Sequence, residues 1–245
     1  MQSSIVYFIA IAVLGALAYF GLQADHNSFV GSLFAAFLSA FMVFFVEMEL
    51  RPQISIVVEQ TPPVLPDGRK FLRVIVENRA LWWPLKLVMD RRPVYQARAW
   101  ITFLTESNDP IFAKGRQMIG RWSNTPEPVR PISIAQGPTG TQGISFLRDL
   151  SMTRDAVDIG SGASEPLDVV MRVPGEDGCR GWHNRIIQNP NTPPEDQFEL
   201  SKGRCRALVR VDTSGRSSKA LFRIVCDVGI GDFRLEPIRK VPRGL

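Results

Sequence analysis

Two short polar clusters hold the side chains best suited to chemistry. They are Gly120-Arg121-Trp122-Ser123 and Cys179-Arg180-Gly181-Trp182-His183-Asn184. Cys179 and His183 could together ligate a metal, or act as a nucleophile and its base. The chain has only 2 His and 3 Cys, so a closed zinc site would need further ligands, and no third group that would orient His183 is evident. No phosphate loop, paired-carboxylate motif, serine elbow or HExxH occurs. We therefore predict no metal, no cofactor and no catalysis, and interpret both clusters as structural loops with Trp182 buried.

Arginines form a second group with a chemical use. The strands predicted below place a set of them on outward-facing positions: Arg73, Arg98, Arg206, Arg210 and Arg223, with Arg204 beside them. A basic sheet face of this kind could bind nucleotide phosphates, anionic lipid or nucleic acid. No aromatic residues are interleaved with these arginines, which argues against nucleic acid. A plainer interpretation, which stays open, is a solvated face balanced by Glu77, Asp212 and Asp227.

A third candidate site is the segment Leu81 to Met89, which is too apolar for an ordinary solvated loop. Paired tryptophans beside cations suit a membrane interface, where rings lie at the level of the headgroups and cations meet anionic lipid. The candidate interface residues are Trp82, Trp83, Lys86, Arg91 and Arg92. The alternative, which stays open, is that the two tryptophans cap one edge of the protein core.

The elements that must position these residues differ between two parts of the chain. Residues 1–50 contain no Pro, Lys or Arg, whereas residues 51–245 contain all 18 Pro and all 29 basic residues. This asymmetry argues against a simple soluble enzyme, a coiled coil or a disordered tail. Ile5 to Leu22 and Phe29 to Val46 are charge-free runs, each able to nearly cross a bilayer at about 1.5 Å per residue. We predict a two-helix transmembrane hairpin in residues 1–50, with helices over about 4–23 and 28–47.

Small residues recur at four-residue spacing along the second predicted helix. One line consists of Gly31, Ala35 and Ser39, and the adjacent line of Ser32, Ala36 and Ala40. Such lines let helix backbones approach closely in lipid. We expect them to close the hairpin against Ala12 and Ala16 of the first predicted helix. Oligomerisation through the same lines is the alternative.

The basic residues predict the sidedness of this hairpin. Arg51 is the first basic residue after the second predicted helix, and the N-terminal tail and the hairpin connection contain none. An excess of Lys and Arg favours a cytoplasmic position for the C-terminal part. Cys179, Cys205 and Cys226 show no metal spacing and no dense disulfide pattern, which is compatible with a reducing interior. The sequence therefore predicts a two-pass integral membrane protein with both termini cytoplasmic.

From residue 51 onward the hydrophobic pattern changes to the twofold alternation of strands. Predicted strands cover residues 53–59, 71–78, 96–105, 167–173, 204–213, 220–227 and 233–237, separated by long loops at about 79–95, 107–144 and 174–203. The clearest alternation is in residues 204–213, where Cys205, Ala207, Val209 and Val211 share one face. Short strands without crossover helices predict an all-β domain over residues 51–245, an antiparallel immunoglobulin-like sandwich.

Two motifs resemble strands of immunoglobulin-like sandwiches in prokaryotic envelope proteins. Phe71 to Asn78 followed by Ala97 to Phe103 is similar to a pair in which a V-x-N turn precedes an Ala-led strand. Phe198 to Val211 is similar to the L-x-x-G-x-Y-x-x-x-V-x-V strand of the same group. The chain departs from these patterns at Arg79, where Gly is usual, and at Cys205, where Tyr is usual. The resemblance implies a fold, that of membrane-anchored prokaryotic immunoglobulin-like proteins, and no catalytic residues.

Three functional hypotheses follow from this organisation. The first is a membrane-anchored, non-enzymatic binding or assembly module that presents a β-sandwich at the membrane surface. The second rests on a resemblance in architecture to two-helix membrane effectors of prokaryotic defence systems, in which a β-domain senses a ligand and triggers membrane disruption. The third is an envelope component with the sandwich outside the cell. The expected partners are the lipid bilayer and a protein partner or second copy, with a nucleotide or anionic lipid as further candidates.

Overall fold

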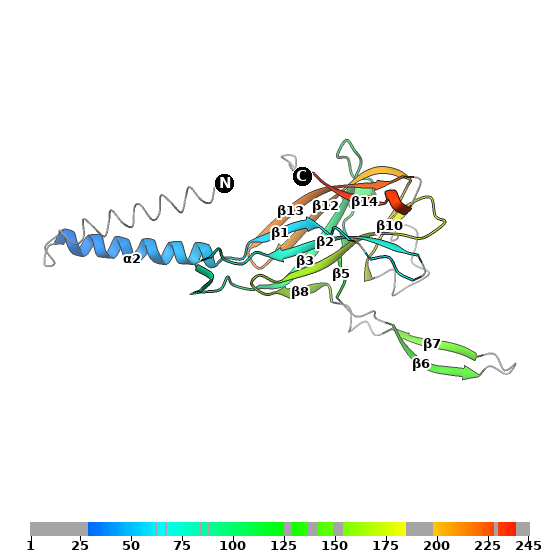
Figure 1. The fold of residues 1–245 in the computed structure, drawn as a ribbon, viewed down its shortest axis with the longest axis horizontal. Helices are drawn as coiled ribbons and strands as arrows, with labels where there is room; N and C mark the ends of the chain where they lie inside the picture. Colours follow the sequence, from blue (N-terminus) through cyan, green and yellow to red (C-terminus); the bar gives the residue numbers. More distant parts are fainter. Residues whose placement is uncertain are drawn as a thin grey trace. The chain divides into compact units, whose positions relative to one another are not determined.

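The structure is a computed structural model that describes residues 29–61, 63–66, 68–83, 85–87, 89–124, 129–136, 142–148, 154–184, 198–227 and 230–238. The chain divides into two compact units, Met1–Arg51 and Pro52–Leu245. The described part of the first unit contains the helix α2, and the second unit contains the strands (Figure 1).

Helix α2 spans Phe29–Leu50. Its sequence is rich in Ala, Leu, Met and Phe and contains no Pro, which favours or tolerates helix throughout. The helix ends at Leu50 because the next residue, Arg51, precedes Pro52, and a residue before proline is driven out of the helical region of backbone conformation. Its exposed apolar side chains include Phe37, Val43 and Phe44.

The prediction of a two-helix transmembrane hairpin is wrong. Over the part of the chain that the structure describes, α2 is the only α-helix, and no helix has the length and apolar character needed to cross a membrane. Unlike the charge-free run read from the sequence, α2 continues past Val46 and includes Glu47 and Glu49, whose carboxylates are costly in hydrocarbon. The predicted first helix, residues 4–23, lies outside the described residues.

Several other predictions depended on that hairpin and are corrected with it. The two-pass topology and the integral membrane localisation with cytoplasmic termini are contradicted. The effector hypothesis, which assumed such a helix pair, stays a prediction. Of the small-residue lines, Ala36, Ser39 and Ala40 are exposed on α2, whereas the side chains of Gly31, Ser32 and Ala35 and the expected partners Ala12 and Ala16 lie outside the described residues.

The second unit contains two six-stranded antiparallel sheets. Sheet A consists of β1 (Ile54–Val58), β2 (Lys70–Asn78), β5 (Arg121–Trp122), β9 (Ser164–Arg172), β10 (Cys179–Gly181) and β11 (Glu199–Leu200). Its order is β1-β2-β9-β10-β11, and β5 also pairs with β9. Short 3-10 helices, η1 (Leu85–Leu87), η2 (Ala113–Gly115) and η5 (Ile230–Asp232), lie in the connections.

Sheet B consists of β3 (Val94–Leu104), β4 (Met118–Ile119), β8 (Ala156–Ile159), β12 (Gly203–Thr213), β13 (Arg216–Cys226) and β14 (Arg234–Ile238). Its order is β14-β13-β12-β3-β4, and β8 also pairs with β3. The strands β6 (Val129–Gln136) and β7 (Gln142–Arg148) form a separate two-stranded sheet.

The main hydrophobic core lies between sheets A and B. Apolar residues from alternate positions of both sheets form one buried cluster, to which sheet A contributes Val74, Val76 and Leu167 and sheet B contributes Ile101, Val209 and Ile224. Trp122 of β5 is completely buried in it. Because successive side chains of a strand point to opposite faces, the remaining positions form the outer faces, where the charged residues lie.

The strand predictions are confirmed for this unit. The seven predicted strands coincide with β1, β2, β3, β9, β12, β13 and β14, and their pairing is antiparallel. The segments predicted as long loops contain further strands, of which β5, β10 and β11 are no more than three residues long.

Candidate functional site

The connection between β2 and β3, residues 79–93, is here called the aromatic loop. Two backbone hydrogen bonds give it helical turns: the N–H of Lys86 donates to the carbonyl of Trp82 (3.3 Å), and the N–H of Met89 donates to the carbonyl of Leu85 (3.0 Å). The 3-10 helix η1 lies within these turns. The described residues between Trp82 and Met89 are therefore held by backbone hydrogen bonds within the loop.

Asn78, the last residue of β2, ties the base of the aromatic loop to the sandwich. Its side chain is fully buried. The Nδ2 group donates to the carbonyls of Arg92 (3.0 Å) and Ile159 (3.4 Å), and Oδ1 accepts from the N–H of Gln53 (3.3 Å). One amide therefore joins the approach to β1, the end of the aromatic loop and the end of β8. Leu81 of the loop is also buried.

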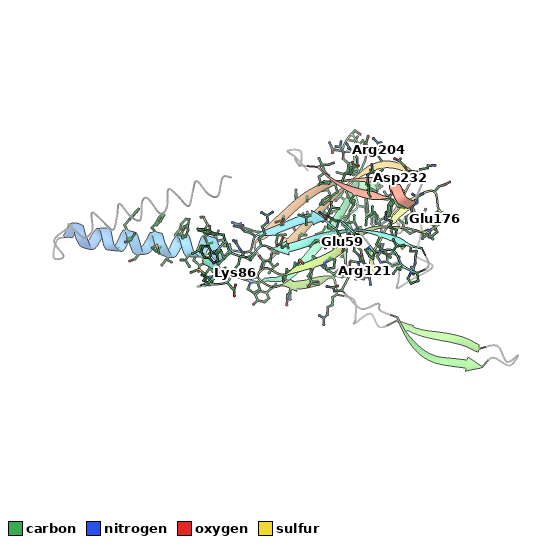
Figure 2. The ribbon with its side chains drawn as sticks, viewed as in Figure 1. Glu59, Lys86, Arg121, Glu176, Arg204 and Asp232 are labelled. Atoms are coloured by element: carbon green, nitrogen blue, oxygen red, sulfur yellow. The ribbon has the colours of Figure 1, made fainter. Side chains whose placement is uncertain are left out.

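The aromatic loop exposes large apolar side chains. Trp83 and Leu87 are each 73% exposed and Trp82 is 45% exposed, and Tyr95 at the start of β3 is exposed as well. Trp83 therefore does not cap the core; Leu81 and Val94 are the buried residues at this position. Lys86 and Arg92 are exposed, whereas Arg91 is buried. Figure 2 shows Lys86 at one end of the sandwich and Glu176 toward the other.

The five predicted anion-binding arginines do not form one surface. Arg73 belongs to sheet A, and the other four belong to sheet B. Three of those four have polar partners: Arg206 donates to Asn108 (2.6 Å), Arg210 pairs with Asp212 (3.2 Å), and Arg223 pairs with Glu106 (3.3 Å) and Glu236 (3.6 Å). Arg98 and Arg204 are exposed. Acidic or polar side chains thus partner three of these arginines, and the anion-binding assignment stays a prediction.

Arg73 takes part in a buried network centred on Asp168, a residue that the sequence analysis did not single out. Asp168 of β9 is fully buried and lies opposite both Arg73 of β2 and Arg121 of β5 in the strand register. Its Oδ1 contacts the Nε of Arg73 (2.5 Å) and accepts from the hydroxyl of Ser123 (2.8 Å), and its Oδ2 contacts Nη1 of Arg121 (3.0 Å). The signal in the sequence is an acidic residue inside the apolar strand LDVVMRV. This network joins three strands of sheet A.

A cleft of about 350 Å³ lies where β1 and β2 approach β14. Leu72 and Phe233 contribute apolar surface, and Lys70, Arg73, Arg234 and Glu59 contribute charge. Burial lowers the pKa of Lys70, and the nearby carboxylate of Asp232 partly offsets that effect. Charges of both signs thus act at the cleft.

Cys179 and His183 do not form a shared site of the kind considered from the sequence. Cys179 is free and buried in the core between the sheets, and the His183 ring packs edge-on against Phe198 at 5.5 Å. Trp182 is buried, as predicted, and packs edge-on against Phe71. Among the described residues, no group of three or more His, Cys, Asp or Glu side chains is placed to hold a metal ion.

The aromatic loop differs from these clusters because its tryptophans face solvent, whereas the Asp168 network and the cysteines are buried. No protein-family model, curated protein or solved structure matches the chain, and the resemblance to prokaryotic immunoglobulin-like envelope proteins stays a prediction.

Proposed function

We propose that the protein is a non-enzymatic binding module whose aromatic loop docks on an anionic lipid surface. The observation that carries this proposal is the exposure of Trp82, Trp83 and Leu87 on a loop whose base is hydrogen-bonded into the sandwich. The contact is peripheral: side chains of one loop enter the headgroup region, and no part of the chain needs to cross the bilayer.

Exposed tryptophans beside cations match the chemistry of a lipid headgroup region. Large exposed apolar side chains mark interaction surfaces, and tryptophan prefers an interface where its ring is in an apolar layer and its N–H is in a wet one. Lys86 and Arg92 are exposed within the same loop, and the chain carries a net charge of +5. A cation near an anionic lipid surface contributes about 1 kcal/mol. Apolar insertion and charge attraction therefore act from one loop.

Order in the loop supports a binding role. A loop that becomes ordered only on docking loses conformational entropy at that moment, which reduces affinity. The turns from Trp82 to Met89 and the hydrogen bonds of Asn78 already hold the aromatic loop in place. Arg91, included among the interface candidates from the sequence, is buried and so belongs to the base of the loop rather than to its contact surface.

Quenching of tryptophan fluorescence by lipids with brominated acyl chains tests this proposal on the full chain. Of the five tryptophans, Trp122 and Trp182 are buried and Trp100 is half-buried, so Trp82 and Trp83 should dominate the quenching. We expect quenching by vesicles that contain phosphatidylserine and much weaker quenching by vesicles of phosphatidylcholine alone. Trp82→Phe/Trp83→Phe should abolish the quenching, whereas Trp100→Phe should retain it.

A charge reversal separates the electrostatic contribution from apolar insertion. Lys86→Glu leaves both tryptophans in place and should weaken association with the anionic vesicles by roughly tenfold or more. Arg204→Glu makes the same change of charge at an exposed position on β12, far from Lys86 in Figure 2, and should have little effect. Equal effects of the two reversals, or tryptophans that anionic vesicles do not quench, would contradict lipid docking by this loop.

A further inference from the structure

Strand β1 forms one edge of sheet A, where its partner is β2. Within the part of the chain that the structure describes, no strand pairs with the other side of β1. Its five residues, Ile-Ser-Ile-Val-Val, are all uncharged, and four of them are β-branched. An apolar edge strand of this kind can pair with a strand of another chain, because its outer row of N–H and carbonyl groups has no partner.

The other edge strands have features that hinder such pairing. In sheet B, β14 contains Pro237 and the charged residues Arg234 and Glu236. Strand β8 has four residues, and a bulge interrupts its pairing with β3. Strands β4, β5 and β11 have two residues each. Shortness, charge, proline and bulges protect exposed edges from other chains. Among the described strands of sheets A and B, β1 is therefore the edge without such protection.

Hydrogen bonds at the two ends of β1 show which of its backbone groups face away from β2. The N–H of Arg79 donates to the carbonyl of Gln53 (3.0 Å), and the N–H of Glu59 donates to the carbonyl of Arg73 (3.1 Å). Hydrogen-bonded positions alternate along an antiparallel pair, so every second residue from Gln53 to Glu59 bonds to β2. The residues between them turn their N–H and carbonyl groups outward, and they are Ile54, Ile56 and Val58.

The sequence around β1 is complementary to itself when two copies run in opposite directions. In an alignment centred on Ile56, Ile54 of each copy lies opposite Val58 of the other. Gln53 of each copy then lies opposite Glu59 of the other. The outward-facing residues form pairs of the hydrogen-bonded kind, in which two residues exchange both N–H···O bonds. Every outward-facing backbone group of β1 therefore gains a partner in this alignment.

Charge favours the same alignment. Arg79 is exposed beside Gln53, and its Nη2 donates to Oγ of Ser55 (3.0 Å), which holds the guanidinium over the edge strand. Glu59 follows the other end of β1, and its shielded Oε2 makes no hydrogen bond within the described residues. Antiparallel alignment about Ile56 places the basic end of one copy beside the acidic end of the other. A parallel alignment would place like charges together, which destabilises strand pairing.

We propose that the outer edge of β1 is an interaction surface for a second copy of this chain, and that two copies pair through antiparallel β1 strands about a twofold axis at Ile56. Sheet A of one copy then continues into sheet A of the other. Because pairing occupies the β1 edge of both copies, the assembly closes as a dimer. The pairing does not depend on lipid docking, since neither Trp82 nor Trp83 takes part in it.

Amide hydrogen exchange of the full wild-type chain tests this proposal without any variant. Sedimentation velocity gives the dimer fraction at each concentration, and NMR gives the exchange rate of each amide. In dilute protein the amides of Ile54, Ile56 and Val58 should exchange rapidly, whereas those of Ser55 and Val57 should be protected by β2. Where about nine-tenths of the chain is dimeric, exchange of the three outward amides should slow by about tenfold, since the monomer alone exchanges. A chain that stays monomeric would overturn self-pairing and leave this edge to a strand of a different protein. A dimer whose outward amides stay rapid would overturn it as well, because the copies then associate elsewhere.

An exchange of charges tests the alignment of the two copies. Glu59→Arg places like charges beside Arg79 of the second copy, twice in a twofold dimer, and should weaken dimerisation by roughly tenfold or more. The double variant Glu59→Arg/Arg79→Glu restores opposite charges and should recover dimerisation. Within one chain the two residues lie at opposite ends of β1, about 20 Å apart at the rise of a strand, so the recovery must arise between copies.

Glu199→Arg is the matched control, because it makes the same change of charge at an exposed position on β11, the opposite edge of sheet A. It should leave dimerisation unchanged. Equal weakening by Glu59→Arg and Glu199→Arg, or a double variant that dimerises no better than Glu59→Arg, would contradict pairing about Ile56. Circular dichroism checks that each variant is folded, and the exchange rates of the wild type remain decisive where a variant is not.

Discussion

Replacing Asp168 by alanine is expected to lower the free energy of unfolding by about 3–5 kcal/mol. The carboxylate is fully buried and contacts Arg73, Arg121 and Ser123. Its removal takes the buried counter-charge away from Arg121 and breaks the charged row that joins β2, β9 and β5. Chemical denaturation, with the slope of the transition compared between the proteins, measures the loss.

The same substitution on the outer face of sheet B is the matched control. Asp212 pairs with Arg210 at 3.2 Å, but both side chains are about one-third exposed (34% for Arg210 and 35% for Asp212). Ion pairs in contact with water contribute little, so Asp212→Ala should cost less than about 1 kcal/mol. Equal losses for Asp168→Ala and Asp212→Ala would show that burial of the Asp168 network does not determine its contribution to stability.

The strands that the sequence predicted each have five or more residues, enough for an alternation of apolar and polar residues to be recognised. Strand β12 shows this pattern most clearly. Its core-facing residues occupy every second position, as the twofold period of a strand requires, and they are Cys205, Ala207, Val209 and Val211. Strands β5, β10 and β11 have two or three residues and so have no measurable period. Their position depends on pairing with β9 and β10, which sequence spacing does not encode.

The candidate sites were harder to predict because they depend on which strands share a sheet. Alternation identified Arg73 and Arg210 as outward-facing, but nothing local indicates that they belong to different sheets. Asp168 and Arg121 are 47 positions apart and meet only through the pairing of β5 with β9. Cys179 and Cys226 both line the core but belong to different sheets, which neither flanking sequence reveals.

The hairpin prediction failed for a different reason. Hydropathy marked the apolar run from Phe29 correctly as helix, and α2 begins at that residue. The inference from an apolar helix to a two-pass membrane hairpin added a partner helix and placed the end of the second helix at about residue 47. The structure instead continues α2 to Leu50, and within the residues it describes no helix qualifies as a span. The local apolar pattern therefore predicted the helix correctly, whereas the membrane hairpin inferred from that helix was wrong.

Substituting Asn78 by alanine should both destabilise the protein and loosen the aromatic loop. The variant leaves the N–H of Gln53 and the carbonyls of Arg92 and Ile159 without the side-chain amide that they contact, and the bond to Ile159 is buried. Each lost partner of a buried polar group costs about 1–3 kcal/mol, and relaxation recovers part of this, so we expect a loss of roughly 2–4 kcal/mol in unfolding free energy. Denaturant unfolding gives the loss, and amide hydrogen exchange over residues 79–93 gives the local effect.

Asn124→Ala is the matched control, because its Nδ2 makes an exposed hydrogen bond to Glu165 (2.6 Å). An exposed amide regains water when its partner is lost, so this variant should change stability by less than about 1 kcal/mol. The decisive measurement is tryptophan quenching in the Asn78→Ala variant. This variant keeps both tryptophans of the aromatic loop, yet anionic vesicles should quench them less than in the wild type. The reason is that a loosened loop must become ordered again on docking, which reduces affinity. If quenching by those vesicles persists at the wild-type level while hydrogen exchange in the loop accelerates, order in the aromatic loop is not required for lipid contact.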